Sequence, residues 1–260
     1  MSGKFVNLAL QCHQGNADAF VKLGYEYLAG KEISKNVVEA VTCFQRAAEK
    51  NHVVAQLNLG ILYHQGIGVE RSVEKAKEWF YLSANQGNRI AQYNLGCIYQ
   101  FGITGIAVDY GKAAYYYELS AKKEYGMAQN NLGWLYLKGL GVEQSNDLAF
   151  YWFVAAAKKG IILAVRHLGE CWLNGYGTQK NEENAFACYE FAAKQGDCIS
   201  MRNLSWFYQR AIGTERNDDL AVEWLLKSEK DNPELVQLTL ASYAKNCGNE
   251  RAKVFLLSNN

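Results

Sequence analysis

The sequence predicts an all-α solenoid, built from six helix-turn-helix repeats with a capping element at each end. A pattern of alanine, leucine-glycine and tyrosine recurs about every 36 residues along the 260-residue chain. Within each copy, apolar residues are three and four positions apart, the spacing that places them on one face of a helix. The chain has 23 glycines and one proline. So few prolines disfavour a multistranded β protein, whose turns and edges use more of them.

The composition narrows the class further. The 27 lysines and arginines nearly balance 26 aspartates and glutamates, giving a net charge of +1, so a strongly basic nucleic-acid binder is not expected. With 49% apolar residues the chain can bury a core and is not mainly disordered. No apolar run reaches the roughly 18 residues of a membrane span. The first residues show no signal-peptide pattern, and we expect a cytoplasmic protein.

The repeat register follows from two columns of small residues. The pattern Ala-x3-Leu-Gly-x2-Tyr begins at Ala19 and returns at steps of 36, 36, 37, 36 and 36 residues. Its first residues are Ala19, Ala55, Ala91, Ala128, Ala164 and, in a degenerate copy, Ser200. A second alanine column, from Ala40 to Ala221, keeps the same period. The one extra residue therefore falls between Gly102 and Ala113, in a loop, where insertions are tolerated.

Each copy is expected to form two helices. Residues 55–63 and 76–84 of the second copy both have helical apolar spacing. Between them stands Gly66-Ile-Gly68, whose first glycine can end a helix in the left-handed conformation. Small residues, including the glycine after each leucine, alternate with large aromatics. This alternation lets neighbouring helices approach closely and interlock.

These residues resemble the Sel1-like repeat, a relative of the tetratricopeptide repeat with a longer loop between its two helices. The segment 55–87 matches the family pattern closely, and the resemblance covers about residues 15–230. It implies a right-handed superhelix in which the first helices of the repeats line the concave face. We expect one solenoid domain over residues 1–260. Residues 1–15 form an N-terminal capping helix, residues 16–231 the six repeats, and residues 232–260 a degenerate C-terminal capping hairpin.

The sequence offers no pattern of a catalytic or metal site. The seven cysteines are Cys12, Cys43, Cys97, Cys171, Cys188, Cys198 and Cys247. They occupy different columns of the repeat and are odd in number, which favours buried reduced thiols over a disulfide framework. No Cys-x-x-Cys pair suggests zinc, and the Gly-x-Gly loops lack the lysine of a phosphate-binding loop. We therefore predict a non-enzyme without catalytic residues, cofactor or metal.

A polar column directly precedes the leucine-glycine pair. It contains Asn58, Asn94, Asn131 and Asn203, with His167 in the same position of the fifth copy. These side chains could tie one repeat's backbone to the next. They could instead face the groove and hold a partner peptide, as the equivalent column does in related tetratricopeptide proteins. Both roles can coexist.

The columns that face the concave groove by resemblance vary while the packing columns do not. Leu57 and Leu137 are among the positions expected to be exposed there. The predicted partner-binding residues are Tyr93, Asn94, Phe101, Asn130, Asn131, Trp134, Arg166, His167, Glu170, Arg202, Asn203, Trp206 and Arg210. From the N-terminal to the C-terminal repeats, the groove positions change from apolar through aromatic to cationic. Trp and Arg are enriched in binding hot spots. We expect a partner whose acidic groups lie near the C-terminal repeats. The double variant Trp134→Ala with Arg202→Ala should abolish binding of this partner. A solvated face with incidental aromatics is the alternative.

Three functions stay open at this point. The first is a non-catalytic adaptor or scaffold that binds another protein or peptide in the groove, with no nucleic acid and no membrane span. A narrower version is an immunity or regulatory protein that neutralises a toxin or effector enzyme, as some bacterial Sel1-like proteins do. The competing class is a weak β-lactam-binding or hydrolysing enzyme, a function linked to cysteine-rich relatives whose disulfide pattern this chain lacks. Incubation with labelled β-lactam separates that enzyme from the two binding functions.

Overall fold

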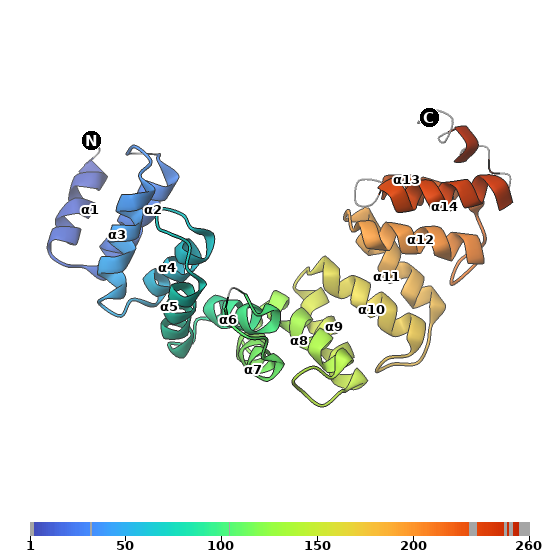
Figure 1. Cartoon of the computed structure of the whole chain (residues 1–260), viewed down its shortest axis with the longest axis horizontal. Coiled ribbons are helices and arrows are strands. Elements are labelled where there is room, and N and C mark those ends of the chain that lie inside the picture. Colours follow the sequence, from blue (N-terminus) through green and yellow to red (C-terminus); the bar gives the residue numbers. More distant parts are fainter. Residues whose placement is uncertain are drawn as a thin grey trace. The chain divides into compact units, whose positions relative to one another are not determined.

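The structure, a computed structural model, describes residues 3–31, 33–103, 105–228, 233–246, 249 and 252–254. Over these residues the secondary structure is helical, without a strand. The helices are α1 (Gly3–His13), α2 (Ala17–Ala29), α3 (Val37–Ala48), α4 (Val53–Gln65), α5 (Val73–Asn85), α6 (Arg89–Phe101), α7 (Tyr110–Ala121), α8 (Gly126–Lys138), α9 (Asn146–Lys158), α10 (Ile162–Asn174), α11 (Glu182–Lys194), α12 (Cys198–Arg210), α13 (Asp218–Lys227) and α14 (Pro233–Asn246) (Figure 1). The predicted all-α fold is confirmed.

The helices pair as the sequence predicts. The two helices of one repeat pack together, as α2 does on α3, α4 on α5, α6 on α7, α10 on α11 and α12 on α13. The second helix of a repeat also packs on the first helix of the next, as α3 does on α4 and α11 on α12. Helix packing of this kind, between neighbours only, is what makes a solenoid.

Contacts within the chain define two compact units, which are described separately. Unit 1 comprises residues 1–128 with 140–142, and unit 2 comprises residues 129–139 with 143–260. Helix α8 contributes residues to both units. Unit 1 otherwise contains α1 to α7, and unit 2 contains α9 to α14.

The core of unit 1 shows why glycine follows leucine in the pattern. A Cβ atom on Gly60 would lie 2.5 Å from the ring of Phe80, and one on Gly96 would lie 2.5 Å from the ring of Tyr117. Phe80 and Tyr117 are both buried. The aromatic ring of the second helix therefore occupies the place of a side chain on the first helix. This close approach offsets the roughly 1 kcal/mol that a helical glycine costs relative to alanine.

The same packing continues in unit 2. A Cβ atom on Gly169 would lie 2.9 Å from the ring of Tyr189, and Phe153 and Phe207 are completely buried. At its C-terminal end α14 packs on α13 and buries Val236 and Leu240. Most of the residues of the predicted capping hairpin that follow α14 lie outside the described residues.

Most of the second helices begin, and most of the first helices end, at the expected residue types. Side chains of Asn36, Ser72, Asp109, Ser145, Asn181 and Asn217 accept hydrogen bonds from the first turns of the second helices. Gly66 ends α4 in the left-handed conformation at φ 70°. In the degenerate sixth repeat Ala211 occupies that position, at φ 55°. Among the described helices, none is long and apolar enough to cross a membrane.

Candidate functional site

Helix α12 of unit 2 carries a row of three predicted binding residues, Arg202, Trp206 and Arg210. They are four residues apart, so their side chains follow one another along one face of the helix. Trp206 is 40% exposed although it is large and apolar, and Arg210 is also exposed. We call Arg202, Trp206 and Arg210 the α12 row. It combines the two residue types most enriched in binding hot spots.

The equivalent rows on α8 and α10 differ from the α12 row. On α8, Trp134 is partly buried against the cluster that contains Leu137 and Phe153. On α10, Glu170 is partly exposed. Asn131 and Asn203, in the polar column, are also partly exposed. Of the predicted residues in unit 2, the α12 row therefore offers the most accessible aromatic and cationic groups.

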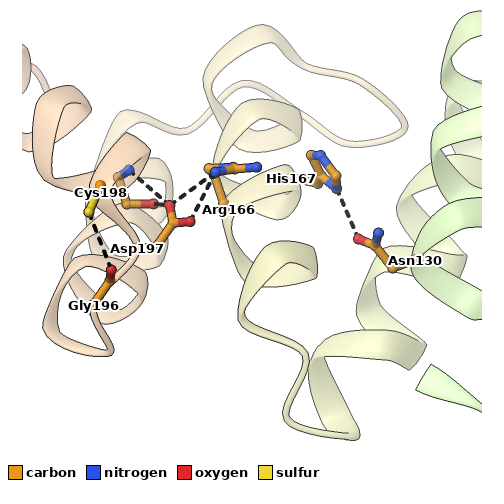
Figure 2. Close-up of polar contacts among 7 residues, drawn as sticks. Asn130, Arg166, His167, Gly196, Asp197 and Cys198 are labelled. Atoms are coloured by element: carbon orange, nitrogen blue, oxygen red, sulfur yellow. Dashed lines mark hydrogen bonds and ion pairs between the residues drawn. The ribbon is translucent and has the colours of Figure 1, made fainter. Parts of the chain in front are cut away.

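Arg166 is engaged within the fold. Its Nη1 atom lies 2.9 Å and 3.2 Å from the two carboxylate oxygens of Asp197 (Figure 2). Asp197 is also the N-cap of α12 and accepts hydrogen bonds from the Ser200 backbone N–H at 2.9 Å and the Ser200 hydroxyl at 2.6 Å. Both charged side chains are less than one-fifth exposed. Arg166 thus joins the fifth repeat to the sixth.

His167, the next residue of α10, reaches the opposite neighbour (Figure 2). Its Nδ1 lies 3.0 Å from Oδ1 of Asn130, and its ring centroid is 4.7 Å from that of Phe153. The Asn130 amide donates to Asn131, so the Asn130 oxygen is the acceptor and His167 Nδ1 carries the proton. Burial lowers the pKa of His167 to about 4, and the positive charges of Arg166 and Lys138 lower it further against the opposing effect of Asp197. The imidazole is therefore neutral at pH 7.

Three positions predicted to be exposed in the groove are buried. Asn130 is 1% exposed, and Leu57 and Leu137 belong to hydrophobic clusters. The prediction of exposure was wrong for these residues. Leu57, Asn130 and Arg166 all precede the leucine-glycine pair by two residues. The contacts of Asn130 and Arg166 show the reason, because side chains in this column turn toward the adjacent repeat rather than away from it.

In unit 1 the predicted residues lie on α6. The Tyr93 ring packs between Tyr117 and Tyr125, at centroid distances of 5.8 Å and 5.1 Å. Asn94 is partly exposed, and Phe101 at the end of the helix is largely exposed. In the same polar column, Asn58 donates to the Tyr25 hydroxyl of the preceding repeat at 2.8 Å and to the Val54 carbonyl at 2.7 Å. Asn58 and His167 therefore both join repeats.

A buried glutamine column was missed by the sequence analysis. Gln56, Gln92 and Gln129 are each less than 5% exposed, directly after the first alanine of three consecutive copies. Gln56 accepts a hydrogen bond from Gln86 at 2.7 Å and donates to Asn51 at 3.0 Å. The signal was visible in the sequence at the repeat period. The column is interrupted by Val165 and Met201 in the later copies.

Burial keeps three of the thiols in their protonated, unreactive form. Six described cysteines are free, and Cys247 lies outside the described residues. Burial raises the pKa of Cys43 to about 11, of Cys171 to about 12 and of Cys188 to about 11. The nucleophilic form of a cysteine is the thiolate, which is scarce at pH 7 in these three residues. Among the described residues, no group of three or more His, Cys, Asp or Glu side chains is placed to hold a metal ion.

Comparison with known proteins identifies the repeats. The family described as Sel1 repeat matches six segments, residues 17–52, 53–88, 89–125, 126–161, 162–197 and 198–232. No curated protein matches the chain. A solved Sel1 repeat protein from Oxalobacter formigenes is 29% identical, with a TM-score of 0.74 over 83% of this chain and 86% of that one.

Two further solved structures were compared with the chain. A protective antigen of uropathogenic Escherichia coli strains is 25% identical, with a TM-score of 0.75 over 97% of this chain. This chain spans 62% of that protein's length. An immunity protein from Pseudomonas aeruginosa is 20% identical, with a TM-score of 0.47 over 84% of this chain and 83% of that one. At that level of similarity it indicates nothing about the role of this chain.

Proposed function

This chain belongs to the Sel1 repeat family, and on that premise we propose that it is a non-catalytic adaptor that binds a segment of another protein through the α12 row. The observation that carries the proposal is the exposure of Trp206 between Arg202 and Arg210 on one face of α12. A tryptophan in this position exposes apolar surface that the fold does not bury. A partner would remove that surface from water, which is the main driving force of association.

The charges of the α12 row favour an acidic partner. Arg202 and Arg210 are one helical turn on either side of Trp206, so carboxylates of a bound segment would lie beside the indole. Arg166 is committed to Asp197, and the proposed basic surface therefore centres on α12 rather than extending over α10. Binding through Arg202 and the exposed Arg210 is expected to weaken as the salt concentration rises.

A catalytic role finds little support in the chemistry of the chain. The buried thiols of Cys43, Cys171 and Cys188 hold their protons at neutral pH, and His167 is hydrogen-bonded between repeats. We place the adaptor in the cytosol, where free thiols such as these stay reduced. A toxin or effector enzyme that the chain neutralises is a narrower form of the same proposal.

The test compares partners captured by two matched variants. Trp206→Ala with Arg210→Ala removes two members of the α12 row. Tyr151→Ala with Lys158→Ala removes an exposed aromatic and an exposed cation from α9, on the second helix of a repeat in the same unit. Affinity purification with quantitative mass spectrometry identifies the partner, and titration calorimetry with that purified partner gives the affinity.

The α12 double variant should weaken binding about 30-fold or more, because hot-spot residues each contribute about 1–2 kcal/mol or more. The α9 variant should bind as the wild type does. Equal affinity of the α12 variant and the wild type would show that the partner uses another surface. Saturable turnover of a labelled β-lactam would replace the adaptor proposal with the enzyme.

A further inference from the structure

A second exposed apolar surface lies in unit 1, on the side of the second helices. It consists of Tyr81 and Leu82 from α5, Tyr99 from α6, and Tyr115 and Tyr116 from α7, which we call the tyrosine face. Helix α6 packs against both α5 and α7 (Figure 1). Tyr81 is 50% and Tyr115 is 58% exposed. None of these residues belongs to the predicted groove or to the α12 row.

The rings of the tyrosine face are ordered against one another. Tyr99 and Tyr116 are stacked at a centroid distance of 5.8 Å and an interplanar angle of 3°. Tyr115 meets Tyr116 edge-on at 5.2 Å and 74°. Burial raises the pKa of Tyr116, and the neighbouring phenols of Tyr99, Tyr81 and Tyr115 raise it further. Tyr116 therefore has the other three tyrosines as close neighbours.

Beside these rings the surface is hollowed. Tyr81, Leu82 and Tyr99 line a depression of about 400 Å³ together with Lys77 and Glu78. The charges at the depression balance, because its lining holds one lysine and one glutamate, and Lys112, over the Tyr99 ring, is paired with Asp109 at 2.9 Å. The depression thus combines aromatic walls with a rim that has no net charge.

The fold itself does not require tyrosine at positions 81 and 115. The repeat register places Gln45 of the first repeat at the position of Tyr81, and Thr42 at the position of Tyr115. Glu118 and Glu190 also occupy the first of these positions, and Glu78 and Glu223 the second. Packing leaves these columns free, so exposed aromatics in two adjacent repeats need another explanation.

We propose that the tyrosine face binds a proline-rich segment of a partner protein in the polyproline II conformation. Such a segment has no internal hydrogen bonds, and its carbonyl groups point outward where phenol hydroxyls can donate to them. Its flat pyrrolidine rings fit between aromatic side chains, which is how aromatic-lined grooves recognise proline-rich sequences. The rim without net charge matches a segment that carries few charges.

The size of the face also favours a short segment. A stable interface between folded proteins buries about 800 Å² on each partner and involves about 20–30 residues a side. Five side chains fall well short of that area, so a second copy of this chain would be held weakly there. A helical peptide would bring apolar side chains, but its backbone carbonyls are already used in its own hydrogen bonds.

The experiment uses the full chain and a fluorescein-labelled decaproline peptide, read by fluorescence anisotropy. A labelled Gly-Ser decapeptide is the composition control, and a Leu-Lys amphipathic helical peptide is the conformational control. Tyr81→Gln with Tyr115→Thr introduces the residues that this chain already has at equivalent positions of its first repeat. Phe191→Ala, at an exposed aromatic of α11, serves as the matched control from unit 2, and far-UV circular dichroism checks folding.

Decaproline should bind more tightly than both control peptides, and the double tyrosine variant should weaken it about tenfold or more, the effect expected of aromatic hot spots. Phe191→Ala should leave its affinity unchanged. The single variant Tyr115→Thr, at a strongly exposed position, provides the same test if the double variant folds poorly. The proposal is overturned if decaproline binds no better than the Gly-Ser peptide, if the helical peptide binds more tightly, or if the tyrosine variants bind as the wild type does. A wild-type dimer in sedimentation velocity that the tyrosine variants dissociate would also overturn it.

Discussion

The polar contacts between successive repeats differ in kind between the two units. In unit 1 they are mainly neutral: Asn58 donates to the Tyr25 hydroxyl, and the Gln86 amide donates to the Asn51 side-chain oxygen at 3.1 Å. In unit 2, α10 is joined to its neighbours by the charged Arg166–Asp197 pair and by the His167 imidazole. Asn58 and His167 occupy the same column of the repeat. The column therefore fixes where a contact forms, and the residue decides how strongly that contact depends on charge and pH.

Burial separates the two units further. Unit 1 has an ionisable contact of its own, in which Nε2 of His52 lies 2.9 Å from Oδ1 of Asp18, but the Asp18 side chain is 76% exposed. Asp197 is the N-cap of α12, as His52 is the N-cap of α4. The Asp197 side chain pairs with Arg166 and is 18% exposed. Exposed pairs contribute little because water and salt screen them. A shielded pair becomes costly when one partner is removed, because the other charge is left uncompensated.

The largest expected effect follows from this difference. Asp197→Ala removes the N-cap of α12 and leaves the shielded guanidinium of Arg166 unpaired, and it should lower the free energy of unfolding of unit 2 by about 3 kcal/mol. His52→Ala removes the N-cap of α4 but only an exposed pair, and should cost about 1 kcal/mol. Urea unfolding followed by tryptophan fluorescence suits unit 2, because five of the six tryptophans lie there. Circular dichroism reports both units.

A third variant separates the two roles of Asp197. Asp197→Asn keeps a good capping residue and removes only the negative charge. Its loss of stability should lie between the wild type and Asp197→Ala. If Asp197→Ala costs no more than His52→Ala, burial of the pair does not distinguish the units.

The second prediction concerns pH and His167. The pKa of this residue is lowered to about 4 in the folded protein from an ordinary value of 6.5, so the unfolded chain binds the proton more readily. The contribution of neutral His167 to the free energy of unfolding is fully present above pH 6.5. It is lost as the pH falls toward 4, where His167 also becomes protonated in the folded state. Between pH 7 and pH 4.5 the loss should be about 2 to 3 kcal/mol.

The control for this pH effect is His167→Asn, which installs the residue found in that column of four other repeats. Other groups titrate in the same range, so the quantity to compare is the difference between wild type and variant in tryptophan-monitored urea unfolding at the two pH values. The variant should lose about 2 to 3 kcal/mol less than the wild type on acidification. If the two proteins lose the same stability on acidification, the pKa of His167 does not differ between the folded and unfolded states.

The sequence was sufficient to predict the fold because the same packing contacts recur at a regular spacing along the chain. Gly60 and Gly96 stand where Phe80 and Tyr117 leave no room for a Cβ atom, and such contacts occur in five of the six copies at a fixed spacing. Periodicity within one sequence thus reveals the columns that the core determines. The loop position of the extra residue, between α6 and α7, also follows from this register.

The candidate site was harder to predict because it depends on how one repeat meets the next. Asn130 and Arg166 vary as groove residues would, yet both are turned toward a neighbouring repeat. The direction of a side chain at the edge of a helix face depends on the angle between helices, which the spacing of residues does not contain. The α12 row keeps an exposed tryptophan. When the residue type varies along a column, the core of its own repeat does not fix that position. Such variation does not show that the side chain is exposed.

The smallest expected effect tests whether a neutral contact between the two helices of a repeat in unit 1 can be moved to unit 2. Ser83 and Ser120 are buried, and their hydroxyls donate to the carbonyls of Val53 and Arg89, near the start of the first helix of the repeat. Ser83→Ala should lower stability by about 1 kcal/mol, the usual net contribution of one hydrogen bond. Because α10 begins at Ile162, the register places the carbonyl of that residue where the hydroxyl of an Ala192→Ser variant would point.

Ala192→Ser should therefore keep or raise stability within about 0.5 kcal/mol, because the new hydroxyl finds an acceptor when it is buried. Circular dichroism measures the first variant and tryptophan fluorescence the second, both in urea. A loss of more than about 1 kcal/mol in Ala192→Ser would mean that the buried hydroxyl has no partner there. The two units would then differ in backbone geometry at this junction, and not only in the side chains that occupy it.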